Sequence, residues 1–171
     1  MKYLTLFLIA LLSLSCEKTD VSLGCDIEIQ HNEKKWKLER CSLMNLPNNR
    51  WMLSLTAKGI IHRKIKHTEA IIFNNLPSAP GIYPLEFGIT GNWGASYPVQ
   101  IQLNEIHWDV MIEHRALDEK ANNYIRIDSF DPQTGLIEGS FHTEWLKTDP
   151  REGGPDNQTI ACKAFALILS E

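Results

Sequence analysis

The sequence lacks several patterns by which common activities are recognised. It has no Cys-x-x-Cys pair and no His-x-x-x-His pair, which are usual spacings of zinc ligands. It has no Gly-x-Ser-x-Gly elbow for a serine nucleophile. The glycine-rich stretch 88–94 (GITGNWG) lacks the Lys-Ser/Thr of a phosphate-binding loop. We therefore expect no metal, no cofactor and no catalytic residues, and predict a protein that is not an enzyme.

Positive charge is also scarce. The chain carries 17 Lys and Arg against 21 Asp and Glu, for a formal net charge of −4. Its densest basic patch, residues 63–67 (RKIKH), is short and is typical of a solvated turn or strand face. A mildly acidic domain without a basic stripe argues against nucleic acid as a partner.

A long apolar run occurs at the start of the chain. Leu4–Leu12 follows a short positive segment and leads to Ser-Leu-Ser before Cys16. This order is typical of a secretory signal, and the run is shorter than the roughly 18 apolar residues of a spanning helix. The stretch 12–16 (LSLSC) resembles a lipobox, although Ser13 stands where a leucine is usual. We predict a signal peptide over residues 1–15 and lipidation at Cys16, which would anchor the protein to the bacterial outer membrane, on its periplasmic face or at the cell surface. The alternative is an ordinary signal peptide with an incidental cysteine.

Cysteine is sparse as well. If Cys16 is lipidated, Cys25, Cys41 and Cys162 remain. Because an exported protein meets an oxidising compartment, we expect one disulfide and one thiol. Three pairings are open, and we favour Cys41–Cys162 because it would tie an early strand to the last one.

The organisation of the mature chain is simple. The segment 16–24 is short and polar, and we expect it to hold the lipidated cysteine and a tether. We expect residues 25–171 to form a single domain. Alternation of apolar and polar residues dominates this domain, whereas residues 114–123 are the best helical candidate and are only a polar turn or loop. We predict an all-β fold, an antiparallel two-sheet β-sandwich of about eight or nine strands. A lipocalin-like β-barrel is the alternative.

Three hairpins carry this prediction. The first joins strands on either side of a turn at 31–34, and Trp36 lies in its second strand. The second pairs 99–103 with 106–112 through a turn at Asn104-Glu105. The third pairs 124–130 with 137–145 through the turn-forming stretch 131–135 (DPQTG). A final interior strand is expected over 160–169.

Several short motifs resemble a group of single-domain all-β lipoproteins common in Bacteroidota. They are Asp26–Trp36 (DIEIQHNEKKW), Gly81–Leu85 (GIYPL), Ile127–Asp131 (IDSFD), Ile137–Phe141 (IEGSF) and a last strand with Phe165. The resemblance covers nearly the whole mature chain. It implies an all-β domain at the cell envelope and brings with it no activity, cofactor or catalytic residue.

Two sets of residues are candidates for chemistry. Glu105, His107 and Asp109 are spaced to share one face of a strand, but we expect a solvated face without metal, because Ile106, Trp108 and Val110 alternate with them. Trp93 lies between Asn92 and Gly94 in a polar loop, where strand packing does not explain it. An exposed Trp93 ring would stack on a sugar or fill a partner's pocket, whereas the alternative is a lid over the end of the domain.

These observations favour a non-enzymatic binding or structural module in the cell envelope. Its expected partners are the membrane, through the lipid on Cys16, and a glycan or an envelope protein. One alternative is a carrier of a hydrophobic ligand, with a cavity lined by Trp51, Trp108 and Phe141. Another is an envelope hydrolase, with a cleft that holds converging acids or a His–acid pair.

Overall fold

The structure is a computed structural model of residues 1–171. It describes residues 29–31, 34–36, 38–62, 65–88, 91, 93–107, 110–111, 115–131, 134, 136–148 and 156–168. Every regular element in these residues is a β-strand, so the all-β prediction is confirmed. Within this part of the chain, no helix is long and apolar enough to cross a membrane. The predicted signal peptide, Cys16 and the tether lie outside the described residues.

The strands differ greatly in length. Eight have seven or more residues, and four have two or three. In chain order they are β1 (Ile29–His31), β2 (Lys34–Trp36), β3 (Leu38–Leu46), β4 (Arg50–His62), β5 (Ile65–Pro77), β6 (Gly81–Phe87), β7 (Val99–His107), β8 (Val110–Met111), β9 (Arg115–Leu117), β10 (Tyr124–Asp131), β11 (Leu136–Lys147) and β12 (Asn157–Ile168).

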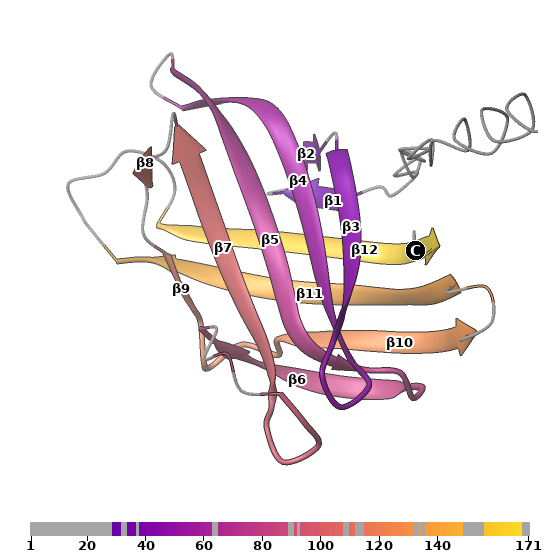
Figure 1. The fold of residues 1–171 in the computed structure, drawn as a ribbon. Helices are drawn as coiled ribbons and strands as arrows, with labels where there is room; N and C mark the ends of the chain where they lie inside the picture. Colours follow the sequence, from indigo (N-terminus) through magenta and orange to yellow (C-terminus); the bar gives the residue numbers. More distant parts are fainter. Residues whose placement is uncertain are drawn as a thin grey trace, which may run out of the picture.

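These strands form one continuous, nearly closed, barrel-like sheet. Its order is β2-β1-β12-β11-β10-β6-β7-β5-β4-β3, with β8 beside β7 and β9 beside β11. β6 joins the two halves, because it pairs with β10 on one side and, in parallel, with β7 on the other. The halves cross steeply (Figure 1). The predicted two-sheet sandwich is therefore not confirmed, whereas the barrel alternative fits.

The core lies between the crossing halves. Leu53, Leu55 and Ala57, the apolar positions of the alternation in β4, are all fully buried. Phe73 of β5 meets Phe141 of β11 with ring centroids 4.9 Å apart, so the two halves contact each other through aromatic side chains. Burial of each such large side chain contributes about 1.5–3 kcal/mol.

The first and third predicted hairpins are confirmed. β1 pairs with β2 in a register that sets Ile29 opposite Trp36, and β10 pairs with β11 so that Asp131 stands opposite Leu136. β12 lies between β11 and β1, as expected of an interior last strand. Here the local alternation and the turn residues were enough to predict the pairing.

The predicted turn at Asn104-Glu105 is wrong. β7 runs on through His107, because Asn104 and Glu105 pair with Ala70 and Glu69 of the long strand β5. The reversal instead lies between His107 and Val110, the residues that pair β7 with β8. Polar residues at 104 and 105 suit a turn, but a neighbouring strand that continues past them holds them extended.

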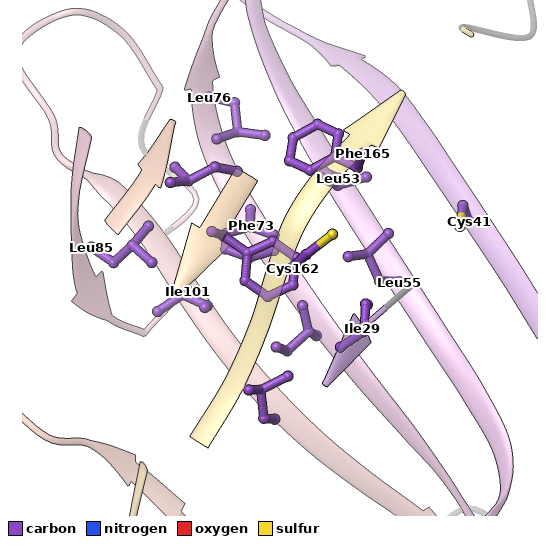
Figure 2. Packing of buried hydrophobic residues seen from close by; sticks show 14 of the residues in the cluster. Ile29, Cys41, Leu53, Leu55, Phe73, Leu76, Leu85, Ile101, Cys162 and Phe165 are labelled. Carbon is purple, nitrogen blue, oxygen red and sulfur yellow. The ribbon is translucent and has the colours of Figure 1, made fainter. Parts of the chain in front are cut away.

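The favoured Cys41–Cys162 disulfide is also wrong. Cys41 is disulfide-bonded, but Cys162 is a buried thiol whose Sγ donates a hydrogen bond to the carbonyl of Ala164 at 3.1 Å. Cys41 of β3 and Cys162 of β12 lie well apart in Figure 2, and the cross-strand neighbour of Cys41 is Leu55 of β4. β3 is an end strand of the sheet and β12 lies between β1 and β11, so no strand pairing sets the two cysteines side by side. The partner of Cys41 lies outside the described residues.

The segment 114–123, expected to be a polar turn or loop, contains a short strand. β9 pairs with β11 in a register that sets Leu117 opposite Trp145. The chain then leaves the sheet and returns as β10. Asn123 bridges this interruption, because its Oδ1 accepts from the Glu144 backbone N–H at 2.7 Å and its Nδ2 donates to the Asp118 carbonyl at 2.6 Å.

Candidate functional site

The loop that carries Trp93 connects two parallel neighbours. β6 ends at Phe87 and β7 begins at Val99, and their parallel pairing requires the chain between them to cross back along the sheet. This loop projects at the same end of the molecule as the turn between β3 and β4 (Figure 1). We call the described loop residues, Gly91 and 93–98, together with the turn residues 47–49, the loop-end surface.

A bulge in β5 turns an asparagine toward this loop. Trp51 of β4 pairs with Leu76 and Leu53 pairs with Phe73, so Asn74 and Asn75 together oppose a single residue of β4. Asn75 is fully buried and has a φ of 62°, in the left-handed region. Asparagine enters this region more readily than most residues, and bulges often redirect a side chain near functional sites.

The carboxamide of Asn75 holds the loop backbone at three residues. Its Oδ1 accepts a hydrogen bond from the Gly94 N–H at 2.9 Å. Its Nδ2 lies 3.1 Å from the carbonyl oxygen of Gly94, 2.8 Å from that of Tyr97 and 3.0 Å from that of Pro98. Because Nδ2 carries two hydrogens and faces three carbonyl oxygens, at least one hydrogen is shared between two acceptors. One buried side chain thus fixes the loop backbone at Gly94, Tyr97 and Pro98.

A second asparagine holds the loop from the turn between β3 and β4. Asn48 and Asn49 have φ values of 62° and 54°, as a tight reversal requires. The Nδ2 of Asn48 donates to the Trp93 carbonyl at 3.0 Å. Asn48, Asn49 and Asn75 are all the non-glycine residues with positive φ in the described chain, and all three lie at this end.

The side chain of Trp93 is only partly exposed to solvent. Its side chain is half-buried, and it lies outside the main hydrophobic cluster and the residues packed against it. Its indole N–H is buried, and no described residue accepts a hydrogen bond from it. A buried donor without an acceptor costs about 1–3 kcal/mol, so stability alone does not explain a tryptophan here. Tyr97, four residues later, is 46% exposed.

A second polar group lies on the outer face of β10, β11 and β12. His142 Nε2 is 3.0 Å from Glu144 Oε1, and the other carboxylate oxygen accepts from Thr159 Oγ1 at 2.8 Å. The His142 ring stacks on Tyr124 with centroids 6.3 Å apart. The sequence reasoning missed this His–acid pair, although the His-x-Glu spacing in a predicted strand was its signal. It can orient a proton acceptor, but the hydroxyl beside it is bonded to the carboxylate and not to the imidazole.

The other predicted residues are not brought together at this surface. Asp109 lies outside the described residues, as do the side chains of Glu105 and His107. Among the described residues, no group of three His, Cys, Asp or Glu side chains is placed to hold a metal ion. Of the proposed cavity lining, Phe141 is packed against Phe73 and Trp51 against Phe130, while Trp108 lies outside the described part.

Comparisons with known proteins identified no relative of this chain. A scan against protein-family models, a search of curated proteins and a search of solved structures each found no match. The chemistry of the loop-end surface has therefore to be inferred from its own residues.

Proposed function

We propose that this chain is a non-enzymatic binding module of the cell envelope, anchored by lipid on Cys16, whose contact surface is the loop-end surface. The observation that carries the proposal is the hydrogen bonding of Asn75 to the loop. Asn75 is fully buried and has a left-handed backbone conformation. Non-glycine residues held in such sparsely populated conformations are concentrated at functional sites.

The hydrogen bonds of Asn75 and Asn48 have a direct consequence for binding. They hold the backbone at the Trp93 carbonyl, at Gly94 and at Tyr97, so both aromatic side chains are attached to an ordered stretch of the loop. A loop ordered before binding loses less conformational entropy when a ligand arrives. Tyrosine and tryptophan also give a large contact area for few rotatable bonds.

An envelope hydrolase is the second candidate, and the His142–Glu144 pair is the observation in its favour. Both side chains are about one-third exposed on an outer strand face. If this pair were catalytic, His142→Gln would abolish hydrolysis of a panel of p-nitrophenyl esters and glycosides by the intact protein. We expect no such hydrolysis above that of a denatured sample.

The binding proposal is tested by sedimentation with purified envelope fragments. Full-length protein is incubated with peptidoglycan sacculi, with lipopolysaccharide and with detergent-extracted outer-membrane protein, and the bound fraction is measured. We expect the Trp93→Ala/Tyr97→Ala double variant to lose binding to at least one fraction. The control variant Tyr124→Ala removes an aromatic ring from the outer face of β10 and should bind as the wild type does. Equal binding by all three proteins would refute the proposal.

A further inference from the structure

The loop-end surface has no side chain that is charged at neutral pH. Its residues, 47–49 (PNN), Gly91 and 93–98 (WGASYP), include no Asp, Glu, Lys, Arg or His. Recognition of phosphate, sulfate or carboxylate relies on Arg and Lys, and a basic ligand would be matched by acids. The composition of this surface therefore disfavours a charged ligand.

The groups that are present suit a ligand with hydroxyl groups and an apolar face. Asn49 and Ser96 are exposed, and a carboxamide both donates and accepts hydrogen bonds. Tyr97 and the half-buried Trp93 provide aromatic surface beside them, each with an apolar body and a polar end. A pyranose ring has the matching pair of surfaces, with C–H groups on its face and hydroxyls around its edge.

The size of the surface also bears on the ligand. The three turn residues and seven described loop residues are few compared with the roughly 20–30 residues that each partner contributes to a stable protein interface. The other exposed large apolar side chains lie on strands outside these two segments: Met44, Ile82, Phe87, Leu146 and Ile168. A short oligosaccharide needs no larger surface.

From charge, chemistry and size together, we infer that the ligand of the loop-end surface is a neutral, pyranose-containing oligosaccharide. This inference rests on the proposed function and gives it a ligand class. Trp93 and Tyr97 supply the stacking surface, and Asn49 supplies hydrogen bonds to the ring hydroxyls. Asn75 acts as a positioning residue, because its carboxamide faces the loop backbone and not the ligand.

Isothermal titration calorimetry of the intact protein against two sets of polysaccharides tests the ligand class. The neutral set is cellohexaose, xylohexaose and mannohexaose, and the acidic set is heparin and polygalacturonate. We expect saturable binding to at least one neutral hexasaccharide, unchanged between 50 mM and 500 mM NaCl. Trp93→Ala should weaken it by about tenfold or more, as for a central aromatic contact. Trp93→Phe keeps a ring and should retain more affinity, and Tyr124→Ala should match the wild type.

The outcomes separate the two claims. Tighter, Trp93-dependent binding to the acidic set that falls steeply with salt would overturn the neutral-sugar inference, and so would Trp93-dependent binding to envelope protein alone. Either result would leave the loop-end surface as the contact. No Trp93-dependent binding to any sugar or envelope fraction would overturn both. Circular dichroism of each variant confirms that it is folded at the titration temperature, so that a lost affinity is not a lost fold.

Discussion

At the scale of single residues, Asn75 is the side chain on which the account depends most. Asn75→Gly removes its carboxamide while allowing the φ of 62° at no steric cost. Loss of these buried hydrogen bonds should lower the free energy of unfolding by about 2–4 kcal/mol. Asn75→Ala should cost about 1 kcal/mol more, because alanine also resists the left-handed conformation. Urea denaturation of the three proteins gives both differences.

A matched control is available in the turn between β3 and β4. Asn48 also has positive φ and also bonds the loop, but it is exposed and donates a single hydrogen bond to Trp93. Asn48→Gly should therefore change stability by no more than about 0.5 kcal/mol, as for most surface substitutions. Equal losses at the two positions would mean that the buried hydrogen bonds of Asn75 have no special weight.

Trp93 should show an intermediate cost. Removal of a fully buried aromatic costs about 3–5 kcal/mol, but Trp93 is half-buried, and no acceptor for its indole N–H is found among the described residues. We expect Trp93→Ala to lower the free energy of unfolding by about 1–2 kcal/mol, as for an average substitution. A loss above this range, with binding unchanged, would show that the ring serves as a lid.

Residue-level reasoning from the sequence is limited to local signals. It singled out Trp93 from its position in a polar loop, yet it overlooked Asn75. In the stretch 70–77 (AIIFNNLP), the asparagines look like the polar end of an apolar strand. Only the register with β4 reveals that two residues oppose one and that a buried amide faces a loop about 20 residues further along the chain.

At the scale of strands, Gly139 permits the close pairing of β10, β11 and β12. A Cβ atom on it would collide with the backbone carbonyl of Arg126 and would lie 2.9 Å from Phe165 Cζ. Gly139→Ala should therefore destabilise the protein by about 3 kcal/mol or more, because backbone on one side and a buried ring on the other leave no room. Ala166→Ser, at an exposed position of β12, is the control and should be nearly neutral. Thermal denaturation followed by circular dichroism measures both, and a stable Gly139→Ala variant would contradict this packing.

Strand-level prediction succeeded and failed for a common physical reason. The alternation in β10 and β11 and the turn chemistry between them are contained within about twenty residues, and the observed register follows from them. The turn at Asn104-Glu105 was equally plausible locally, but a long partner strand, β5, decided against it. Sheet order is likewise a non-local property, so alternation predicted all-β structure without distinguishing a sandwich from a barrel-like sheet.

At the scale of the whole molecule, the disulfide partner of Cys41 depends on whether Cys16 is lipidated. Cys162 is a thiol and Cys41 is disulfide-bonded, so the partner of Cys41 is one of the two cysteines outside the described part, Cys16 and Cys25. If Cys16 carries lipid, the partner must be Cys25. We therefore predict a Cys25–Cys41 disulfide together with a diacylated Cys16 at the mature N-terminus.

Mass spectrometry of the protein purified from membranes tests both parts of this prediction. Non-reducing digestion should yield a peptide in which Cys25 is joined to Cys41, and the N-terminal peptide should begin at Cys16 and carry the lipid mass. A Cys16–Cys41 peptide would exclude lipidation of that molecule. An unmodified N-terminus at any other residue would contradict the outer-membrane anchor.

The central claim is that the Trp93 loop is ordered before any ligand binds, and amide hydrogen exchange at Gly94 tests it most directly. The Gly94 N–H donates to a fully buried carboxamide oxygen at 2.9 Å. In the ligand-free protein we predict that this amide exchanges as slowly as the amides of neighbouring β5, and that Asn75→Gly restores fast exchange. A Gly94 amide that exchanges at the rate of an unstructured peptide in the wild type would contradict the account.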